Sequence, residues 1–209
     1  KGIRSDTEDI YEAISKNVTV NRDGLTEDGH PGNSQLNIYR EYGYIPYDFG
    51  SSSNVLDYAY DDWVVAQMAK KVGDTENYVL LMERSGSYMN IFHPEKKFFV
   101  PKNSSGQWMP DFSEFSGKSF IEGNSWQYSW YLPHAIPELV DLLGPELFNK
   151  RLEEGFEKSA KWKFAAHAFD RTESQTAEYY INHGNQVNMQ AAWLFNFSGK
   201  PWLTQKYTN

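Results

Sequence analysis

Cysteine is absent from the 209 residues of this chain. Disulfide bonds, thiolate metal sites and a cysteine nucleophile are therefore excluded within it. Hydrophobic runs long enough to cross a bilayer are absent as well, so we expect no membrane span. The first residues lack an initiator methionine and the apolar core of a signal peptide. We interpret the chain as an internal fragment of a longer protein.

An excess of basic residues is also missing. The formal net charge is −8 at pH 7, and the isoelectric point is about 5.1. Binding to nucleic acid needs clustered lysine and arginine to neutralise phosphates, so we expect no nucleic-acid partner. The chain is 40% hydrophobic and 23% charged, which is typical of a globular protein.

Aromatic residues, in contrast, are abundant. They make up 16% of the chain, with 7 Trp, 14 Tyr and 13 Phe. This composition fits either a large aromatic core or a site that stacks flat, partly apolar ligands such as sugar rings.

The hydrophobic pattern predicts helices. Residues 51–73 carry apolar side chains at helical spacing and end at Gly73. Residues 74–94 repeat the plan, with Thr75 as a possible N-cap and Pro94 beyond the end. The two segments predict an antiparallel helical hairpin across a very short loop.

The rest of the chain alternates between turns and helices. Residues 1–50 are rich in turn formers, and residues 94–121 read as a long connection. Pro137 and Pro145 suit the first turns of helices, and Gly144 suits a helix stop. Further helices are expected at 145–159, 176–185, 188–199 and from 200 onward. We therefore expect an all-α fold of paired helices and long loops.

Glu122 is the first candidate for chemistry. It precedes a Gly-Asn pair and then Trp126, Tyr128 and Trp130. A carboxyl group buried against aromatic surface has a raised pKa, and it can then donate a proton near neutral pH. The alternative is a glutamate at a helix start, which the helix dipole favours.

Two further groups have less specific patterns. His183-Gly184-Asn185-Gln186 offers amide oxygens that suit calcium and an imidazole that can bind a sugar hydroxyl. A capped turn with Asn185 as N-cap explains the same residues. Asp62, next to Asp61, could face a site, or it could make a buried hydrogen bond at the edge of a solvated helix face.

Four blocks of the sequence, taken together, resemble glycoside hydrolase family 92, the calcium-dependent α-mannosidases. They occur in family order and cover most of the chain from about Tyr39 onward. The blocks are "LDYAYDDWVVAQMAK" (56–70), "RSGSYMNIF" (84–92), "EGNSWQYSWYLPHAIPELVDLLG" (122–144) and "HGNQVNMQAAWLFNFSGKPWLTQKY" (183–207).

The resemblance implies a fold and a reaction. Family members have a β-sandwich followed by a six-hairpin α/α toroid, and residues 1–209 would be a fragment of that toroid. The enzymes remove terminal α-mannose with inversion, as in the degradation of N-glycans. The partners implied are α-mannoside glycans and the remainder of the parent chain. Secretion, or export to a bacterial periplasm, is implied as well.

The resemblance also implies roles for individual residues. Glu122 would be the general acid, with the aromatic residues after it walling the sugar pocket. The general-base aspartate is expected beyond Asn209. The cofactor would be Ca2+, held in part by Asn185 and Gln186. The implied substrate-binding residues are His183, Gly184, Asn124, Trp126 and Asp62.

One departure from the family pattern bears on specificity. Enzymes that cleave α-1,2 linkages tend to have His-Glu-Asn-Glu where this chain has His-Gly-Asn-Gln at 183–186. Gly184 lacks the carboxylate that would contact the neighbouring sugar, and Gln186 is neutral. The departure counts against α-1,2 linkages and leaves α-1,3, α-1,4 and α-1,6 linkages open.

Two alternatives to a mannosidase remain. Another α/α-toroid glycosidase, acting on glucosides, would generally not need calcium. A helical carbohydrate-binding or scaffold module would use the aromatic residues for stacking and would have no turnover.

Overall fold

The computed structural model describes residues 7–21, 32–164 and 179–208. The chain divides into two compact units, which are treated separately below. Unit 1 comprises Lys1–Ile91 and Lys102–Gln107. Unit 2 comprises Phe92–Pro101 and Trp108–Asn209.

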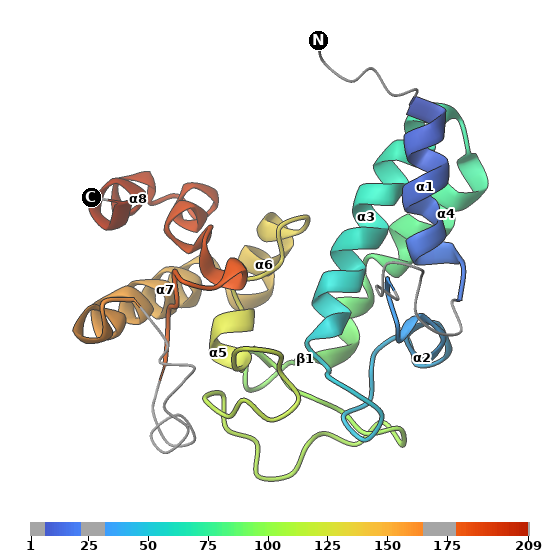
Figure 1. Ribbon diagram of the computed structural model, residues 1–209. Helices are drawn as coiled ribbons and strands as arrows, with labels where there is room; N and C mark the ends of the chain where they lie inside the picture. The colour runs from blue at the N-terminus through green and yellow to red at the C-terminus, as the bar shows by residue number, and fades with distance from the viewer. Residues whose placement is uncertain (1–6, 22–31, 165–178, 209) are drawn as a thin grey trace. The chain divides into compact units, whose positions relative to one another are not determined.

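Unit 1 is helical. Helix α3 packs against both α4 and α1, as Figure 1 shows. Val65 and Ala66 from α3 meet Leu81 from α4 and Val18 from α1 in a small apolar core. The elements are α1 (Thr7–Thr19), α2 (Leu36–Tyr42), α3 (Asn54–Val72), α4 (Thr75–Arg84) and the 3-10 helix η1 (Ser87–Ile91).

The predicted hairpin of α3 and α4 is present. Gly73 ends α3 with φ 83°, a left-handed conformation that glycine adopts at little cost. Asp74 caps α4 by accepting a hydrogen bond from the Asn77 amide at 3.1 Å. The cap is therefore Asp74 and not Thr75.

Two predictions for unit 1 were wrong. Residues 1–50 contain α1 and α2, although we expected only turns. Helix α1 is amphipathic, but polar side chains outnumber its apolar ones, and of its residues only Val18 is buried. The second helix of the hairpin ends at Arg84 rather than near Pro94, and η1 follows Ser85 and Gly86.

Unit 2 contains a small β-hairpin and several helices. The strands are antiparallel, with Phe92 opposite Phe99, so the expected all-α fold is corrected to a mostly helical one. The elements are β1 (Phe92–His93), β2 (Phe98–Phe99), α5 (Ser125–Tyr128), α6 (Ile136–Leu143), α7 (Pro145–Ser159), η2 (Ala160–Trp162), η3 (Gln186–Asn188), η4 (Ala191–Phe197) and α8 (Pro201–Thr208).

The core of unit 2 is built from large aromatic residues. Trp130 is fully buried and meets Phe148 of α7 edge to face, with ring centroids 5.5 Å apart. Phe156 of α7 stacks on Tyr207 of α8 at 4.5 Å. Much of the aromatic excess in the sequence therefore serves packing.

The expected helix at 176–185 is also corrected. Residues 176–178 lie outside the described residues, and residues 179–185 are not helical. Asparagine side chains supply their backbone hydrogen bonds instead, as when Asn188 accepts from the Asn182 amide at 3.0 Å. The next predicted helix, at 188–199, is the 3-10 helix η4 rather than an α-helix.

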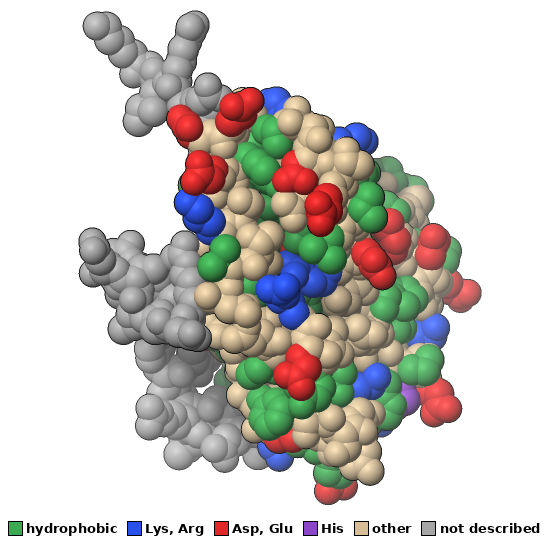
Figure 2. All heavy atoms as spheres, turned by 90° about the vertical axis from the view of Figure 1, so that its right-hand side faces the viewer, with side chains coloured by type: hydrophobic (Ala, Val, Ile, Leu, Met, Phe, Trp, Pro, Cys, Tyr) green, Lys and Arg blue, Asp and Glu red, His purple; other side chains and the backbone are tan. Residues whose placement is uncertain are grey.

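The described helices include none that is long and apolar enough to cross a membrane. Figure 2 shows the side on which α1 and α4 lie in Figure 1. Acidic and hydrophobic side chains are interspersed there. Val79 and Leu80 of α4 are exposed apolar residues, at 58% and 48%.

Candidate active site

Glu122 lies in the turn before α5, and its backbone is unusual. Its φ is 53°, a left-handed backbone conformation that residues other than glycine rarely adopt. Two side chains hold the carbonyl groups of this turn. The Tyr128 hydroxyl donates to the Ile121 carbonyl at 2.8 Å, and Asn185 Nδ2 donates to the Glu122 carbonyl at 2.7 Å. The glutamate side chain itself is exposed.

The two residues after Glu122 complete the turn. A Cβ on Gly123 would lie 2.9 Å from Gln127 Oε1 and 3.1 Å from the Tyr128 ring, so both neighbours would have to shift to admit a side chain. Asn124 caps α5 by accepting from the Gln127 amide at 2.9 Å, and it donates to the Tyr179 carbonyl at 3.0 Å. Both ends of this buried amide are thus engaged with the backbone.

The aromatic residues after Glu122 do not surround its carboxylate in this chain. Trp126, Tyr128 and Trp130 are 4%, 4% and 0% exposed, and they pack into the core of unit 2. Helix α5 turns them inward while Glu122 stays at the surface. In the described residues these side chains contribute to the core of unit 2, and their role as the wall of a sugar pocket stays a prediction.

The loop at residues 183–186 contacts the turn that carries Glu122. The Asn185 contact with Glu122 joins two segments that are 63 residues apart in the chain. Asn182 Oδ1 accepts from the Gly184 amide at 2.9 Å, which shapes the turn between them. The sequence predicted both segments as site residues, and the structure brings them together.

His183 is held from two sides. Its ring lies 5.5 Å from Phe164 and 5.6 Å from Phe156, centroid to centroid. Partial burial by these rings lowers the pKa of His183. The imidazole is therefore favoured in its neutral form, in which it has one donor and one acceptor nitrogen.

The amide side chains at 185 and 186 fit part of a calcium site. Asn185 uses its Nδ2 on Glu122, which leaves Oδ1 as a hard oxygen donor, and Gln186 is exposed. Calcium takes six to eight oxygen ligands, so two amides are an incomplete set. The described residues contain no cluster of three or more His, Cys, Asp or Glu that could hold a metal.

Asp62 lies in unit 1 and is 1% exposed. Its two oxygens accept from Arg84, at 2.7 Å from Nε and 2.5 Å from Nη2, and one also accepts from the Tyr39 hydroxyl at 3.2 Å. This is a buried bidentate ion pair. The geometry favours the structural interpretation of Asp62 over substrate binding.

Sequence reasoning missed several supporting residues. Asn188 Nδ2 donates to the Gln127 carbonyl at 2.8 Å, and Gln190 Nε2 donates to the Trp130 carbonyl at 2.9 Å. Gln127 is 2% exposed, and its Nε2 has no hydrogen-bond partner in the described part of the chain, which is rare for a buried donor. The repeated amides in "NSWQ" and "NHGNQVNMQ" were the available signal.

Comparison with known proteins assigns the chain to a family. The profile described as the glycosyl hydrolase family 92 catalytic domain matches residues 1–209. The chain belongs to glycosyl hydrolase family 92. A family GH92 α-mannosidase from Bacteroides thetaiotaomicron is similar in structure, with 32% identity over 99% of this chain and a TM-score of 0.76.

Two other proteins are similar as well. An inverting mannosidase from the same bacterium shares 26% identity over 97% of this chain, with a TM-score of 0.78. An uncharacterized secreted glycosidase of the fungus Arthroderma benhamiae shares 25% identity over 94% of it. This chain spans 25% and 28% of the two mannosidase chains and 27% of the fungal protein.

Proposed function

We propose that the protein containing this chain is an inverting exo-α-mannosidase and that Glu122 is its general acid. One observation carries the proposal. Within a family 92 chain, Glu122 is an exposed carboxylate whose own backbone is held by Asn185 of the 183–186 loop. An acid must reach the leaving-group oxygen from a fixed position, and this turn provides one.

The proposed reaction is a single displacement at the anomeric carbon. Glu122 donates its proton to the glycosidic oxygen, and the bond from that oxygen to the anomeric carbon breaks. A water molecule, deprotonated by a second carboxylate, attacks the opposite face of the ring. The proposal assigns that base to a part of the protein outside residues 1–209. The product is mannose of inverted configuration.

The neighbouring residues have proposed roles in substrate binding. His183, whose ring is partly covered by Phe156 and Phe164, is assigned a hydrogen bond to a sugar hydroxyl, and Gly184 is assigned the space for the adjoining sugar. Asn124 and Trp126 act indirectly, because the first caps α5 and the second is a buried residue of that helix. Calcium, held in part by Asn185 Oδ1 and Gln186, would supply positive charge that binds sugar hydroxyls.

The substrates proposed are α-mannoside glycans, such as those on N-glycosylated proteins. A structure of the same bacterial α-mannosidase is a complex with mannoimidazole, and its chain shares 32% identity with this one. Export from the cell is proposed on the likeness to a secreted fungal glycosidase.

The experiment is mannose release by the complete protein from α-1,2-, α-1,3-, α-1,4- and α-1,6-mannobiose. Proton NMR in the first minutes reports the anomer, and we expect β-mannose. A calcium chelator is expected to abolish release, and added calcium to restore it. Release of α-mannose would contradict inversion, and release from none of the four would contradict the function.

A further inference from the structure

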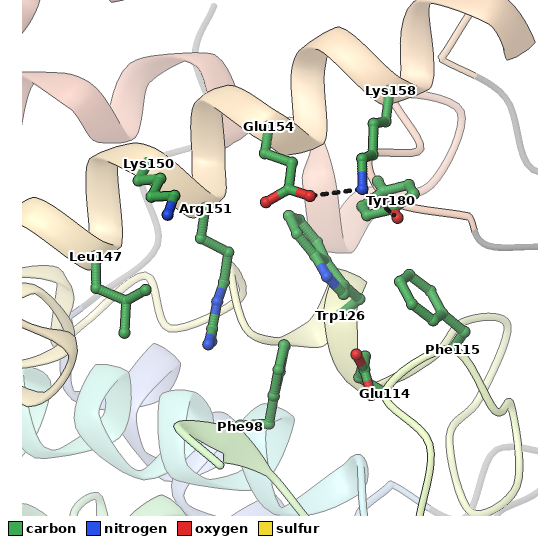
Figure 3. Close-up of a pocket in the computed structure, with 10 residues that line it drawn as sticks. All are labelled: Phe98, Glu114, Phe115, Trp126, Leu147, Lys150, Arg151, Glu154, Lys158 and Tyr180. Atoms are coloured by element: carbon green, nitrogen blue, oxygen red, sulfur yellow. Dashed lines mark hydrogen bonds and ion pairs between the residues drawn. The ribbon is translucent and has the colours of Figure 1, made fainter. Parts of the chain in front are cut away.

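A pocket of about 420 Å³ lies in unit 2, and Glu122 does not line it. Helix α7 forms one side, from which Lys150, Arg151, Glu154 and Lys158 project, as Figure 3 shows. Aromatic side chains form much of the remaining wall, and they are Phe98, Phe115, Trp126 and Tyr180. The volume lies within the range of small-molecule sites and suits a ligand of monosaccharide size.

Two of the charged side chains in the pocket neutralise each other. Lys158 and Glu154 form an ion pair at 2.6 Å, and Lys158 also donates to the Tyr180 hydroxyl at 3.0 Å. This pair raises the pKa of Lys158. Glu154 is therefore engaged and does not balance the remaining cations.

With Lys158 paired, two cations of the pocket lining remain, and Arg151 is the more buried of them. Its guanidinium carbon lies 4.0 Å from the centre of the Phe98 ring, and its Nη1 donates to the Lys97 carbonyl. No carboxylate of the described residues forms an ion pair with it. Partial burial lowers the pKa of Arg151, and the negative charges of Glu114 and Glu154 oppose that change. Arginine nevertheless stays charged in proteins.

The net charge of the pocket follows from its lining. The lining holds Lys150, Arg151 and Lys158 against Glu114 and Glu154. One positive charge is therefore left over, beside a wall made largely of aromatic side chains. Lys150, which is exposed and has no ion pair in the described part of the chain, is one of the three cations in this count.

We propose that this pocket binds the anionic group of a small acidic ligand, a phosphate or a carboxylate, through the guanidinium of Arg151. The contacts to Phe98 and Lys97 fix the plane of the guanidinium. Its remaining N–H groups can then meet two oxygens of the anion in one plane. Such a site is separate from hydrolysis at Glu122 and goes beyond the proposed function.

The test is calorimetric titration of the complete protein with inorganic phosphate and, separately, with glucuronate. The methyl ester of glucuronate is the uncharged control ligand. We expect at least one of the two anions to bind, and we expect the ester not to bind. Binding of phosphate alone assigns a phosphate ligand, and binding of glucuronate alone assigns a carboxylate. Absence of binding by both anions at 10 mM would overturn the proposal (about 3 kcal/mol or less of affinity).

Variants locate the binding. Arg151→Met should weaken it by about tenfold or more, and Arg151→Lys by less, because lysine keeps the charge and loses the planar fork. Lys206→Met is the matched control, since Lys206 is an exposed cation paired with Glu153 outside this pocket. Unchanged binding by Arg151→Met would overturn the proposal.

Two further variants keep the test decisive. If Arg151→Met fails to fold, the exposed Lys150→Met should still weaken binding by roughly threefold through its lost positive field, and unchanged binding would count against the site. Glu122→Gln should bind the anion as the unmodified protein does. Loss of mannose release without loss of anion binding would therefore concern the proposed function alone.

Discussion

At the scale of single residues, Asn185 has two proposed roles in the candidate site. Its Nδ2 holds the Glu122 carbonyl at 2.7 Å, where the Glu122 backbone has a positive φ. A strained conformation of this kind persists only when its surroundings enforce it. Its Oδ1 is the atom proposed for calcium. The positioning role follows from the hydrogen bond and does not depend on the metal.

Substitution of Asn185 separates positioning from general stability. We expect Asn185→Ala to lower kcat for mannobiose by about tenfold, since a small displacement of a catalytic group has that order of effect. The loss should be smaller for an aryl mannoside with a good leaving group, which needs little help from an acid. Asn196→Ala, in the exposed part of η4, is the control. Equal losses on both substrates would contradict the positioning role.

At the scale of elements, α7 contains a glycine that its neighbours require. A Cβ on Gly155 would lie 2.8 Å from the Trp126 ring and 3.2 Å from the Ile181 side chain. Gly155→Ala should therefore destabilise the protein by about 1–3 kcal/mol, despite a helix-propensity gain of about 1 kcal/mol. Glu157→Ala, on the exposed side of the same helix, is the control. Chemical denaturation measures both, and a stabilised Gly155→Ala protein would refute the packing argument.

The start of α4 gives a pH-dependent prediction. Asp74 accepts from the Tyr11 hydroxyl at 2.7 Å and from the Asn77 side chain at 2.7 Å, besides the Asn77 amide. These hydrogen bonds, that of Tyr11 first, lower the pKa of Asp74. A carboxyl group with a lowered pKa in the folded state stabilises that state above its unfolded pKa. This contribution is lost as the pH falls through the folded pKa.

Asp74→Asn keeps a capping side chain and removes the charge. Hydrogen exchange of residues 75–84 should show less protection in Asp74→Asn than in the unmodified protein at pH 7. The difference in opening free energy should shrink as the pH is lowered below about 4, the ordinary value for an aspartate. A difference that stays constant across this range would show that the charge contributes nothing.

The elements that the sequence predicted are those with strong local signals. Gly73 marks the loop of the α3–α4 hairpin, and Pro145 marks the start of α7. Helix α1 was not predicted because its side chains are mostly polar. Residues 179–185 read as helical, yet Asn182, Asn185 and Asn188 direct their hydrogen bonds elsewhere. The backbone group that an amide side chain hydrogen-bonds is set by tertiary contacts, and the hydrophobic pattern of the sequence carries no information about those contacts.

The candidate site likewise has a part that the sequence predicted and a part that only the structure shows. Glu122 and the 183–186 loop were identified through their resemblance to a family. Their contact through Asn185 needed the fold. The burial of the aromatic residues after Glu122 also needed the fold, because the sequence gives their spacing from the acid but not the direction in which α5 turns them. Asp62 was open to two interpretations, and its buried ion pair with Arg84 favours the structural one.

At the scale of the whole molecule, residues 1–209 expose large apolar side chains on several elements. Among the described residues, the most exposed are Met189 at 67%, Trp193 at 65%, Trp202 at 58% and Val79 at 58%. Exposed apolar surface of this kind favours association. We expect residues 1–209 expressed alone to self-associate, and Trp193→Lys with Trp202→Lys to reduce this. Sedimentation velocity measures it, and a compact monomer over a wide concentration range would contradict it.

The most direct test of the account compares Glu122→Gln with the unmodified complete protein on two substrates. One is mannobiose, which needs protonation of its leaving group, and the other is 2,4-dinitrophenyl α-mannoside, which does not. We predict a loss in kcat/KM of about 10²–10⁴-fold on mannobiose and a far smaller loss on the aryl mannoside. Glu138→Gln, an exposed glutamate on α6, should match the unmodified protein. Full mannobiose turnover by Glu122→Gln would contradict the assignment of Glu122 as the acid.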